Sequence, residues 1–185
     1  MKTEKQKMLD GELYNPYDAV LSAERLRCRE LCRLFNDSRE DQEIERKRIL
    51  SDLFGEQEDV MIQPPFFCDY GSNITLGLNV FFNFNCVLLD VMKIKIGDNG
   101  LFGPAVHIYT ATHPLSAVKR RLGLELASPV SIGSDVWVGG NSVICPGVTI
   151  GDRSVIGAGS IVTKDIPADV FAAGNPCKII RTIQE

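Results

Sequence analysis

The sequence is poor in histidine, has no long apolar run and carries no excess of positive charge. Only His107 and His113 are present, so a zinc centre held by three histidines cannot be built from this chain. The formal net charge of −4 argues against a protein that binds nucleic acid by neutralising many phosphates. Neither a signal peptide nor a membrane span is indicated, so we expect a cytoplasmic protein with no membrane partner.

Paired cysteines are also lacking. The six cysteines, which form no C-x-x-C pair, are Cys28, Cys32, Cys68, Cys86, Cys145 and Cys177. In a reducing compartment we expect them to be free and mostly buried thiols. Cys28 and Cys32 can share one face of a helix, but two thiols without a nearby histidine make a poor metal site. We therefore expect no metal.

The first part of the chain, residues 1–58, has a helical pattern. Thr3 can cap a short helix, Ser22 can cap a longer one, and Ser38 with Asp41 resembles a capping box for a third. Glu, Arg and Lys alternate here, which is typical of a solvated helix surface. With 185 residues, 44% of them apolar, the chain is long enough for one cored domain with this helical lobe attached.

From Ile62 onward an apolar residue recurs at every sixth position, in three series. The series are Ile62, Cys68, Ile74, Val80 and Cys86; then, after an offset of four residues near 92–95, Ile96, Phe102 and Ile108; then Ile132, Val138, Ile144, Ile150, Ile156 and Val162. Ordinary half-buried strands, in which every second residue is buried, would also fit this period, because six is a multiple of two. They do not explain the glycines that directly follow many of these residues, at 97, 103, 133, 139, 151 and 157. A coil of short strands needs both the apolar filler and the small corner residue, so we predict a mainly β solenoid over residues 59–185.

Residues 109–131 interrupt the solenoid pattern without changing its phase. The coil can therefore extrude this segment as a loop and resume in register. His113 lies at the root of the loop. Because the side of a solenoid is flat, we expect this loop to create a cleft by reaching over a neighbouring subunit, with a binding pocket there.

Several segments resemble a known family. They are "IGSDVWVGGNSVICPGVTIGDRSVIGAGSIVTKDIPADVFAAGNPCKIIR", "CDYGSNITLG" and "IYTATHP", with "GELY" and "ERLR" in the helical lobe. The chain resembles the hexapeptide-repeat acetyltransferases, most closely the maltose and galactoside O-acetyltransferase group. This resemblance implies a left-handed parallel β-helix that assembles as a homotrimer with active sites between subunits. It also implies acetyl transfer from acetyl-CoA to a sugar hydroxyl, with no metal required.

Such a transfer needs a base that removes the hydroxyl proton while the oxygen attacks the thioester. Histidine has a suitable pKa for this role, and its protonated form can assist departure of the CoA thiolate. In the family the histidine of the "THP" motif is the base, which the resemblance assigns here to His113. His107 has no matching role, and we expect it to be exposed.

The resemblance also implies contacts with the acceptor. The residues assigned to it are Asn83, Asp90, Glu125 and Asp18. Alternatively, Asn83 stabilises a corner of the coil, and Glu125 either orients the histidine or is solvated. Val91 and Pro16 stand where the galactoside branch has acidic residues, which favours a glucose- or maltose-like acceptor.

For the cofactor, the resemblance assigns small, aromatic and cationic positions. They are Trp137, Gly140, Ala158, Thr163, Lys164 and Arg181. Trp137 would pack along the pantetheine arm, and the last three would lie near the nucleotide and its phosphates. The basic run Lys119 to Arg121 could add phosphate contacts, although such a run in a loop is commonly solvated.

Other functions remain open. A galactoside, xenobiotic or antibiotic O-acetyltransferase would share the coil and the base. A zinc enzyme of the γ-carbonic anhydrase kind would share the fold, but it needs three histidines. A non-catalytic solenoid that serves as an assembly module would have no use for the loop histidine.

Overall fold

The structure is a computed structural model that describes residues 1–55 and 59–184. Three helices come first: α1 (Glu4–Leu9), α2 (Ala19–Asn36) and α3 (Glu43–Phe54). The strands are β1 (Val60–Ile62), β2 (Phe66–Cys68), β3 (Ile74–Leu76), β4 (Val80–Phe82), β5 (Cys86–Leu89), β6 (Ile94–Ile96), β7 (Leu101–Phe102), β8 (His107–Tyr109), β9 (Ala111–Thr112), β10 (Leu126–Ala127), β11 (Val130–Ile132), β12 (Trp137–Val138), β13 (Val143–Ile144), β14 (Thr149–Ile150), β15 (Val155–Ile156), β16 (Ile161–Val162), β17 (Val170–Ala173) and β18 (Lys178–Thr182). A short helix, α4 (Ala117–Arg120), lies in the loop between β9 and β10. The predicted boundary at residue 58 lies outside the described residues.

Side chains cap the starts of α1 and α2 but not that of α3, and two of the predicted caps are wrong. Thr3 caps α1 in a capping box, as expected. The cap of α2 is Asp18, whose carboxylate accepts the backbone N–H groups of Val20 and Leu21, so Ser22 already lies inside the helix. Ser38 does not cap α3, because that helix begins only after Gln42.

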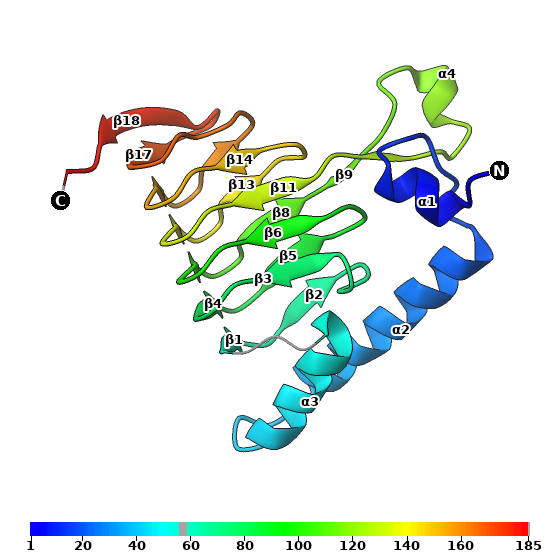
Figure 1. The fold of residues 1–185 in the computed structure, drawn as a ribbon, viewed down its shortest axis with the longest axis horizontal. Helices are drawn as coiled ribbons and strands as arrows, with labels where there is room; N and C mark the ends of the chain where they lie inside the picture. The colour runs from blue at the N-terminus through cyan, green and yellow to red at the C-terminus, as the bar shows by residue number, and fades with distance from the viewer. Residues whose placement is uncertain (56–58, 185) are drawn as a thin grey trace.

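The strands form a solenoid with three faces, and the strands within each face run mostly parallel (Figure 1). One sheet has the order β1-β4-β7-β12-β15-β17-β18, a second β16-β13-β8-β5-β2, and a third β14-β11-β6-β3. Apart from β9, β10 and β18, consecutive strands therefore lie on different faces, and each strand pairs with the strand one coil away. Among the described strands, only β18 against β17 and the β9–β10 hairpin pair antiparallel.

The six-residue period is confirmed in the later coils, but the first series shifts by two residues after Cys68: Val80 pairs with Val60 rather than with Ile62, and Cys86 pairs with Phe66 rather than with Cys68. Every member of the three predicted series is buried, with at most 7% of its surface exposed. Phe66, Phe82 and Phe102 form an aromatic column within this core, with ring centroids 5.9 Å and 4.5 Å apart. Because every strand except β18 is only two to four residues long, the continuous apolar interior supplies most of the packing between coils.

The glycines after the core residues are required by the spacing of the coils. A Cβ atom at Gly139 would lie 2.5 Å from the backbone nitrogen of Ala158 in the next coil. At Gly103 and Gly151 the corresponding distances to the next coil are 2.5 Å and 2.4 Å. Real Cβ atoms do not approach backbone atoms so closely, so a side chain here would push successive coils apart.

The coils are longer at one corner, which we call the wide corner. It joins the five-stranded sheet to the four-stranded sheet, and it follows β2, β5 and β8. Eight residues separate the aligned positions Cys68 and Leu76 across it, whereas six separate Ile144 and Ile150 in a later coil. The predicted offset of four residues near 92–95 is the sum of two extra residues in each of the first two coils, because Leu88 and Ile96 are also eight residues apart. The third coil extrudes its long loop from the same corner.

The helices pack against this side of the solenoid (Figure 1). Cys28, Cys32 and Phe35 of α2 share a core cluster with Phe66 of the first coil. A second cluster, which joins the N-terminal segment to the wide corner and the loop, consists of Met8, Tyr14, Leu21, Tyr70, Val91, Met92 and Ala127. None of the described helices is long and apolar enough to span a bilayer.

We predict that Gly139→Ala lowers the free energy of unfolding by about 1–3 kcal/mol, because the new methyl group overlaps the backbone of the next coil. Gly100→Ala is the matched control. A Cβ atom there approaches only side-chain atoms, 3.0 Å from Phe102 and 3.2 Å from Ile96, which can shift. Thermal and urea unfolding measure both variants. Equal losses would show that coil spacing is not the constraint at Gly139.

Candidate active site

The loop leaves the wide corner as a β-hairpin. Its arms are β9 and β10, in which Thr112 pairs with Leu126. The next residues outward along the two arms are His113 and Glu125, so the hairpin register sets them opposite each other. The sequence thus places a histidine and a carboxylate together at the root of the loop.

The loop beyond His113 is held by its own side chains. Ser116 caps α4, and the Arg120 guanidinium donates to the carbonyl oxygens of Pro114 and Leu115, both at 3.1 Å. Arg120 therefore fixes the backbone directly after His113 rather than standing free in solvent. Lys119 and Arg121 are exposed.

Glu125 is fixed by the N-terminal lobe. Tyr14 and Glu125 form an antiparallel bridge, with both backbone hydrogen bonds at 3.1 Å. The Tyr14 hydroxyl also donates to the Glu125 carboxylate at 2.6 Å. Burial raises the pKa of Tyr14, and the Glu125 carboxylate raises it further, so the phenol remains a hydrogen-bond donor.

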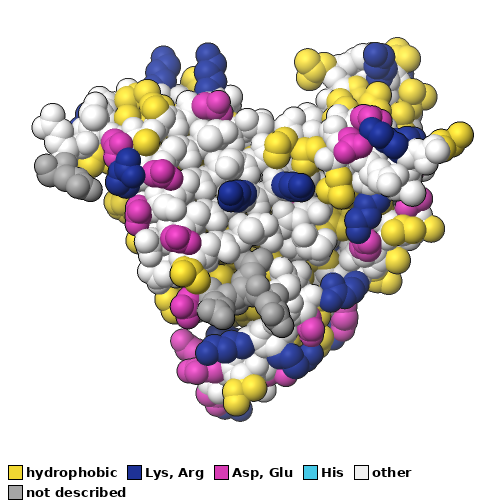
Figure 2. Space-filling model, viewed as in Figure 1, with side chains coloured by type: hydrophobic (Ala, Val, Ile, Leu, Met, Phe, Trp, Pro, Cys, Tyr) yellow, Lys and Arg dark blue, Asp and Glu magenta, His cyan; other side chains and the backbone are white. Residues whose placement is uncertain are grey.

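A pocket of about 420 Å³ lies between the lobe, the wide corner and the loop. It is lined by Tyr14, Pro16, Tyr17, Arg25, Arg29, Asp69, Leu89, Val91, Ala111, His113 and Glu125. Figure 2 shows the loop rising from the body of the molecule, with a recess between it and the C-terminal coils. The lining mixes charges of both signs with apolar atoms, which suits a small ligand that carries many hydroxyl groups.

Two arginines and a carboxylate set the charge at the floor of the pocket. Burial raises the pKa of Asp69, while Arg25 and Arg29 oppose that rise. Arg25 is held in place by hydrogen bonds to the Tyr70 hydroxyl, at 2.7 Å, and to the carbonyl oxygen of Pro16. The site therefore offers fixed donors and acceptors to a ligand.

Asp90 has a different task from the acceptor contact assigned to it. Its side chain is fully buried, and its carboxylate accepts the backbone N–H groups of Asp69 and Tyr70 at 2.9 Å each, and that of Asn73 at 3.4 Å. Asp90 thus holds the wide corner that presents Asp69, and it has no surface to offer a ligand. Burial raises the pKa of Asp90 to about 7.

Asp18 and Asn83 are also not among the residues that line the pocket. The Asp18 carboxylate is occupied as the cap of α2. Asn83 follows β4 at another corner, where its side-chain oxygen accepts the N–H of Phe84 at 2.8 Å. It stands in the same column as Gly103 and Gly139, so it faces away from the wide corner.

Most of the predicted cofactor residues lie at the corner of Asn83, Gly103 and Gly139, or on the seven-stranded sheet that leads into it. Gly140 and Ala158 follow β12 and β15 there. Trp137 of β12 is 54% exposed on the seven-stranded sheet. On the same sheet, Arg181 of β18 stacks over the ring of Phe171 at 5.7 Å.

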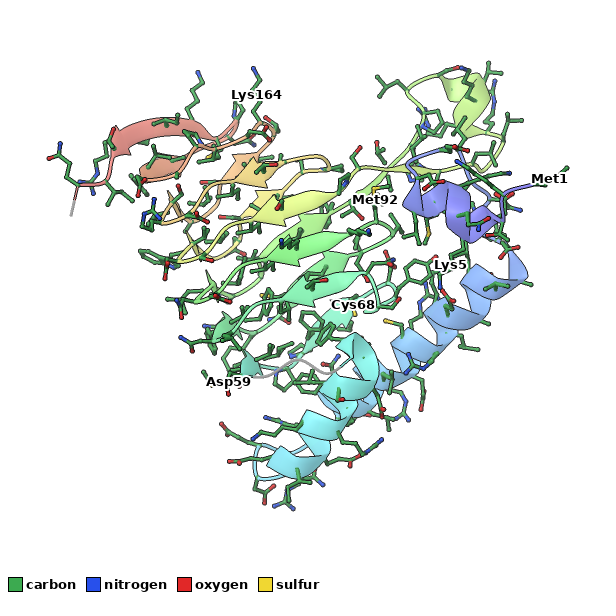
Figure 3. The ribbon with its side chains drawn as sticks, viewed as in Figure 1. Met1, Lys5, Asp59, Cys68, Met92 and Lys164 are labelled. Carbon is green, nitrogen blue, oxygen red and sulfur yellow. The ribbon has the colours of Figure 1, made fainter. Side chains whose placement is uncertain are left out.

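Thr163 and Lys164 instead follow β16, beyond the five-stranded sheet. They lie at the corner that carries the pocket, but in a coil nearer the C-terminus, where Lys164 projects outward (Figure 3). The predicted site residues therefore fall into two groups on two corners of one chain.

His107 was expected to be exposed, but it is half-buried, with Nδ1 2.6 Å from the Tyr109 hydroxyl.

Sequence reasoning missed five polar residues of the pocket: Tyr14, Tyr17, Arg25, Arg29 and Asp69. Three of them lie within motifs that carried the family resemblance, namely "GELY", "ERLR" and "CDYGSNITLG". Only their position in space shows that these motifs meet. Arg29 follows Arg25 by one helical turn, a spacing that places both on one face of α2.

Comparison with known proteins places the chain in a class. Residues 7–57 match the model of the maltose acetyltransferase hexapeptide capping motif, and residues 129–164 match that of the hexapeptide repeat of succinyl-transferase. A protein of Saccharomyces cerevisiae named as an acetyltransferase is 47% identical over 97% of this chain and 93% of its own length.

Two solved structures are also similar. A maltose O-acetyltransferase from Clostridium difficile 630 is 51% identical, with a TM-score of 0.98 over 100% of this chain and 99% of that one. A galactoside acetyltransferase in complex with coenzyme A is 40% identical, with a TM-score of 0.92 over 100% of this chain and 92% of that one.

Together these matches define an acyltransferase with the left-handed parallel β-helix of the hexapeptide-repeat enzymes. The chain belongs to the hexapeptide-repeat acetyltransferase family, in the maltose and galactoside O-acetyltransferase group.

The buried Asp90 carboxyl predicts a pH dependence of stability. Because its pKa is raised from 3.8 to about 7 on folding, protonated Asp90 adds stability that is fully present below about pH 4 and is lost as the pH rises through 7. Wild-type stability should therefore fall between pH 5 and pH 8 more than that of Asp90→Asn, whose side chain does not titrate. The readout is urea unfolding at each pH.

The matched control is Asp98→Asn, because Asp98 also accepts a backbone N–H, that of Leu78, but at an exposed corner. This variant should keep the wild-type pH dependence. If Asp90→Asn kept it as well, the buried carboxyl would not be the titrating group.

Proposed function

We propose that this enzyme transfers the acetyl group of acetyl-CoA to a hydroxyl of a sugar, with His113 as the general base. The observation that carries the proposal is the placement of His113 and a fixed carboxylate, Glu125, at facing positions of the hairpin in one pocket that also presents Arg25, Arg29 and Asp69. The imidazole removes the hydroxyl proton while the oxygen attacks the thioester carbonyl. The tetrahedral intermediate then expels the CoA thiolate, which takes the proton from the imidazolium, and the products are the acetylated sugar and CoA.

Glu125 supports this role in one of two ways. Glu125 faces His113 across the hairpin and lines the same pocket, so its carboxylate can stabilise the imidazolium that forms, or it can accept a hydrogen bond from the acceptor. Tyr14 holds the carboxylate in either case. The contacts to the remaining sugar hydroxyls then fall to Arg25, Arg29 and Asp69.

For the acceptor we propose a glucosyl sugar such as glucose or maltose. Val91 and Pro16, which stand where the galactoside branch has acidic residues, both line the pocket. Fewer acceptor groups at these positions leave less to recognise an axial hydroxyl. A larger kcat/KM for a thiogalactoside than for maltose would overturn this assignment.

Trp137, Gly140 and Ala158 lie away from the pocket of their own chain, which is the basis for proposing a homotrimer with shared sites. In that assembly the corner with Trp137, Gly140 and Ala158 faces the pocket of the next subunit and binds the pantetheine arm. Asn83 then reaches the acceptor from the neighbouring chain. The faces that would meet carry exposed apolar side chains, such as Leu101, which is 48% exposed.

We place the enzyme in the cytoplasm, since all six cysteines are free in the structure.

His113→Ala should lower the turnover number for acetyl transfer to maltose by about two to four orders of magnitude, the effect of losing a general base. The readout is thiol release from acetyl-CoA. His107→Ala is the matched control, because it removes the other histidine of the chain and should leave turnover near the wild-type value. Thiol release by His113→Ala within a few-fold of wild type would rule out His113 as the base.

A further inference from the structure

Three cysteine sulfurs converge where the helical lobe meets the first coil. Cys28 and Cys32 lie four residues apart on α2, so they share one face of that helix, and Cys68 ends β2 beneath it. The Cys68 sulfur lies 3.5 Å from that of Cys28 and 3.8 Å from that of Cys32. Figure 3 shows Cys68 on the side of the solenoid that faces α2.

The cluster is enclosed. The exposed fractions of Cys28, Cys32 and Cys68 are 0%, 4% and 7%, and all three sulfurs lie within 4.8 Å of one another. Among the described residues, no histidine or carboxylate joins the three thiols as a further ligand. The nearby Asp90 carboxylate is already occupied by backbone N–H groups.

We propose that these three cysteines form a binding site for a soft, thiophilic metal ion, with Cu(I) as the best fit. Three thiolates about 2.3 Å from a central ion in a trigonal plane lie about 4 Å from one another, close to the spacing seen here. Zinc normally takes a fourth ligand, which this enclosed cluster lacks, whereas soft thiolate sets favour Cu(I).

Metal binding requires deprotonated thiols. Contacts with Cys28 and Cys68 lower the pKa of Cys32, whereas the contact with Cys32 raises the pKa of Cys28, and the contacts with both sulfurs raise that of Cys68. As the ion binds, each remaining thiol that becomes a ligand releases its proton to solvent. No change in oxidation state is involved.

The position of the cluster links it to the acceptor pocket. Cys28 lies one helical turn beyond Arg25, and Cys68 directly precedes Asp69. An ion held by all three sulfurs would join α2 to β2, and with them the two elements that present these pocket residues. Because the ion would bind the folded chain, it should stabilise the contact between the lobe and the coil.

The test is an anaerobic titration of the reduced, full-length protein with Cu(I), in competition with a chromogenic Cu(I) chelator. We expect one chelator-resistant Cu(I) per chain and a raised melting temperature. X-ray absorption of the loaded protein should show three sulfur ligands at about 2.3 Å. Failure of wild type to hold copper against the chelator would overturn the proposal.

The variants Cys28→Ala and Cys68→Ser should each lower the Cu(I) affinity by about tenfold or more, since each removes a ligand. Cys145→Ser is the matched control, because Cys145 lies outside the cluster and should not alter binding. Near-ultraviolet circular dichroism checks that each variant folds, and Cys32→Ala replaces either variant that does not. Equal affinities in the cluster variants and in Cys145→Ser would also overturn the proposal.

Discussion

The close approach of successive coils is the constraint on which the rest of the structure depends. Each coil bonds its backbone to the next, and at corners such as Gly139 the two backbones come too near for a Cβ atom. A regular stack of this kind has a filled interior and flat faces, so it has no space for a ligand. Chemistry can therefore be placed only where the coil departs from its repeat.

Those departures gather at one corner. Two extra residues widen it in the early coils, a loop leaves it in the third, and the helical lobe covers it. Asp90 stabilises the widened backbone from inside, and the bridge between Tyr14 and Glu125 ties the lobe to the loop across 111 residues of chain. The pocket thus exists because three separate segments meet where the repeat is interrupted.

The sequence predicted what depends on periodicity. The buried core, the corner glycines and the position of His113 at the loop root all follow from residues spaced by six. Contacts between the lobe and the coil could not be predicted in this way, because they depend on how α2 packs. Cys68 therefore seemed unrelated to Cys28 and Cys32, and two thiols alone gave no reason to expect a metal site.

Residue type alone could not decide the roles of the aspartates. A short carboxylate can accept hydrogen bonds equally well from a ligand or from backbone N–H groups. Asp18 and Asp90 both resemble acceptor contacts in sequence, yet the structure uses one as a helix cap and the other inside a corner. Only burial and hydrogen-bond partners distinguish these uses.

In the proposed trimer, His113 and the cofactor groove that serve one site belong to different subunits. Co-expression of His113→Ala chains with Ala158→Trp chains, whose groove is blocked by the exposed new side chain, distinguishes this arrangement from a site built within one chain. Each variant alone should be inactive. Random mixing in a trimer should restore about one quarter of the sites, those that combine an intact histidine from one chain with an intact groove from the next. Mixed trimers that remain as inactive as the separate variants would show that each site is built within a single chain.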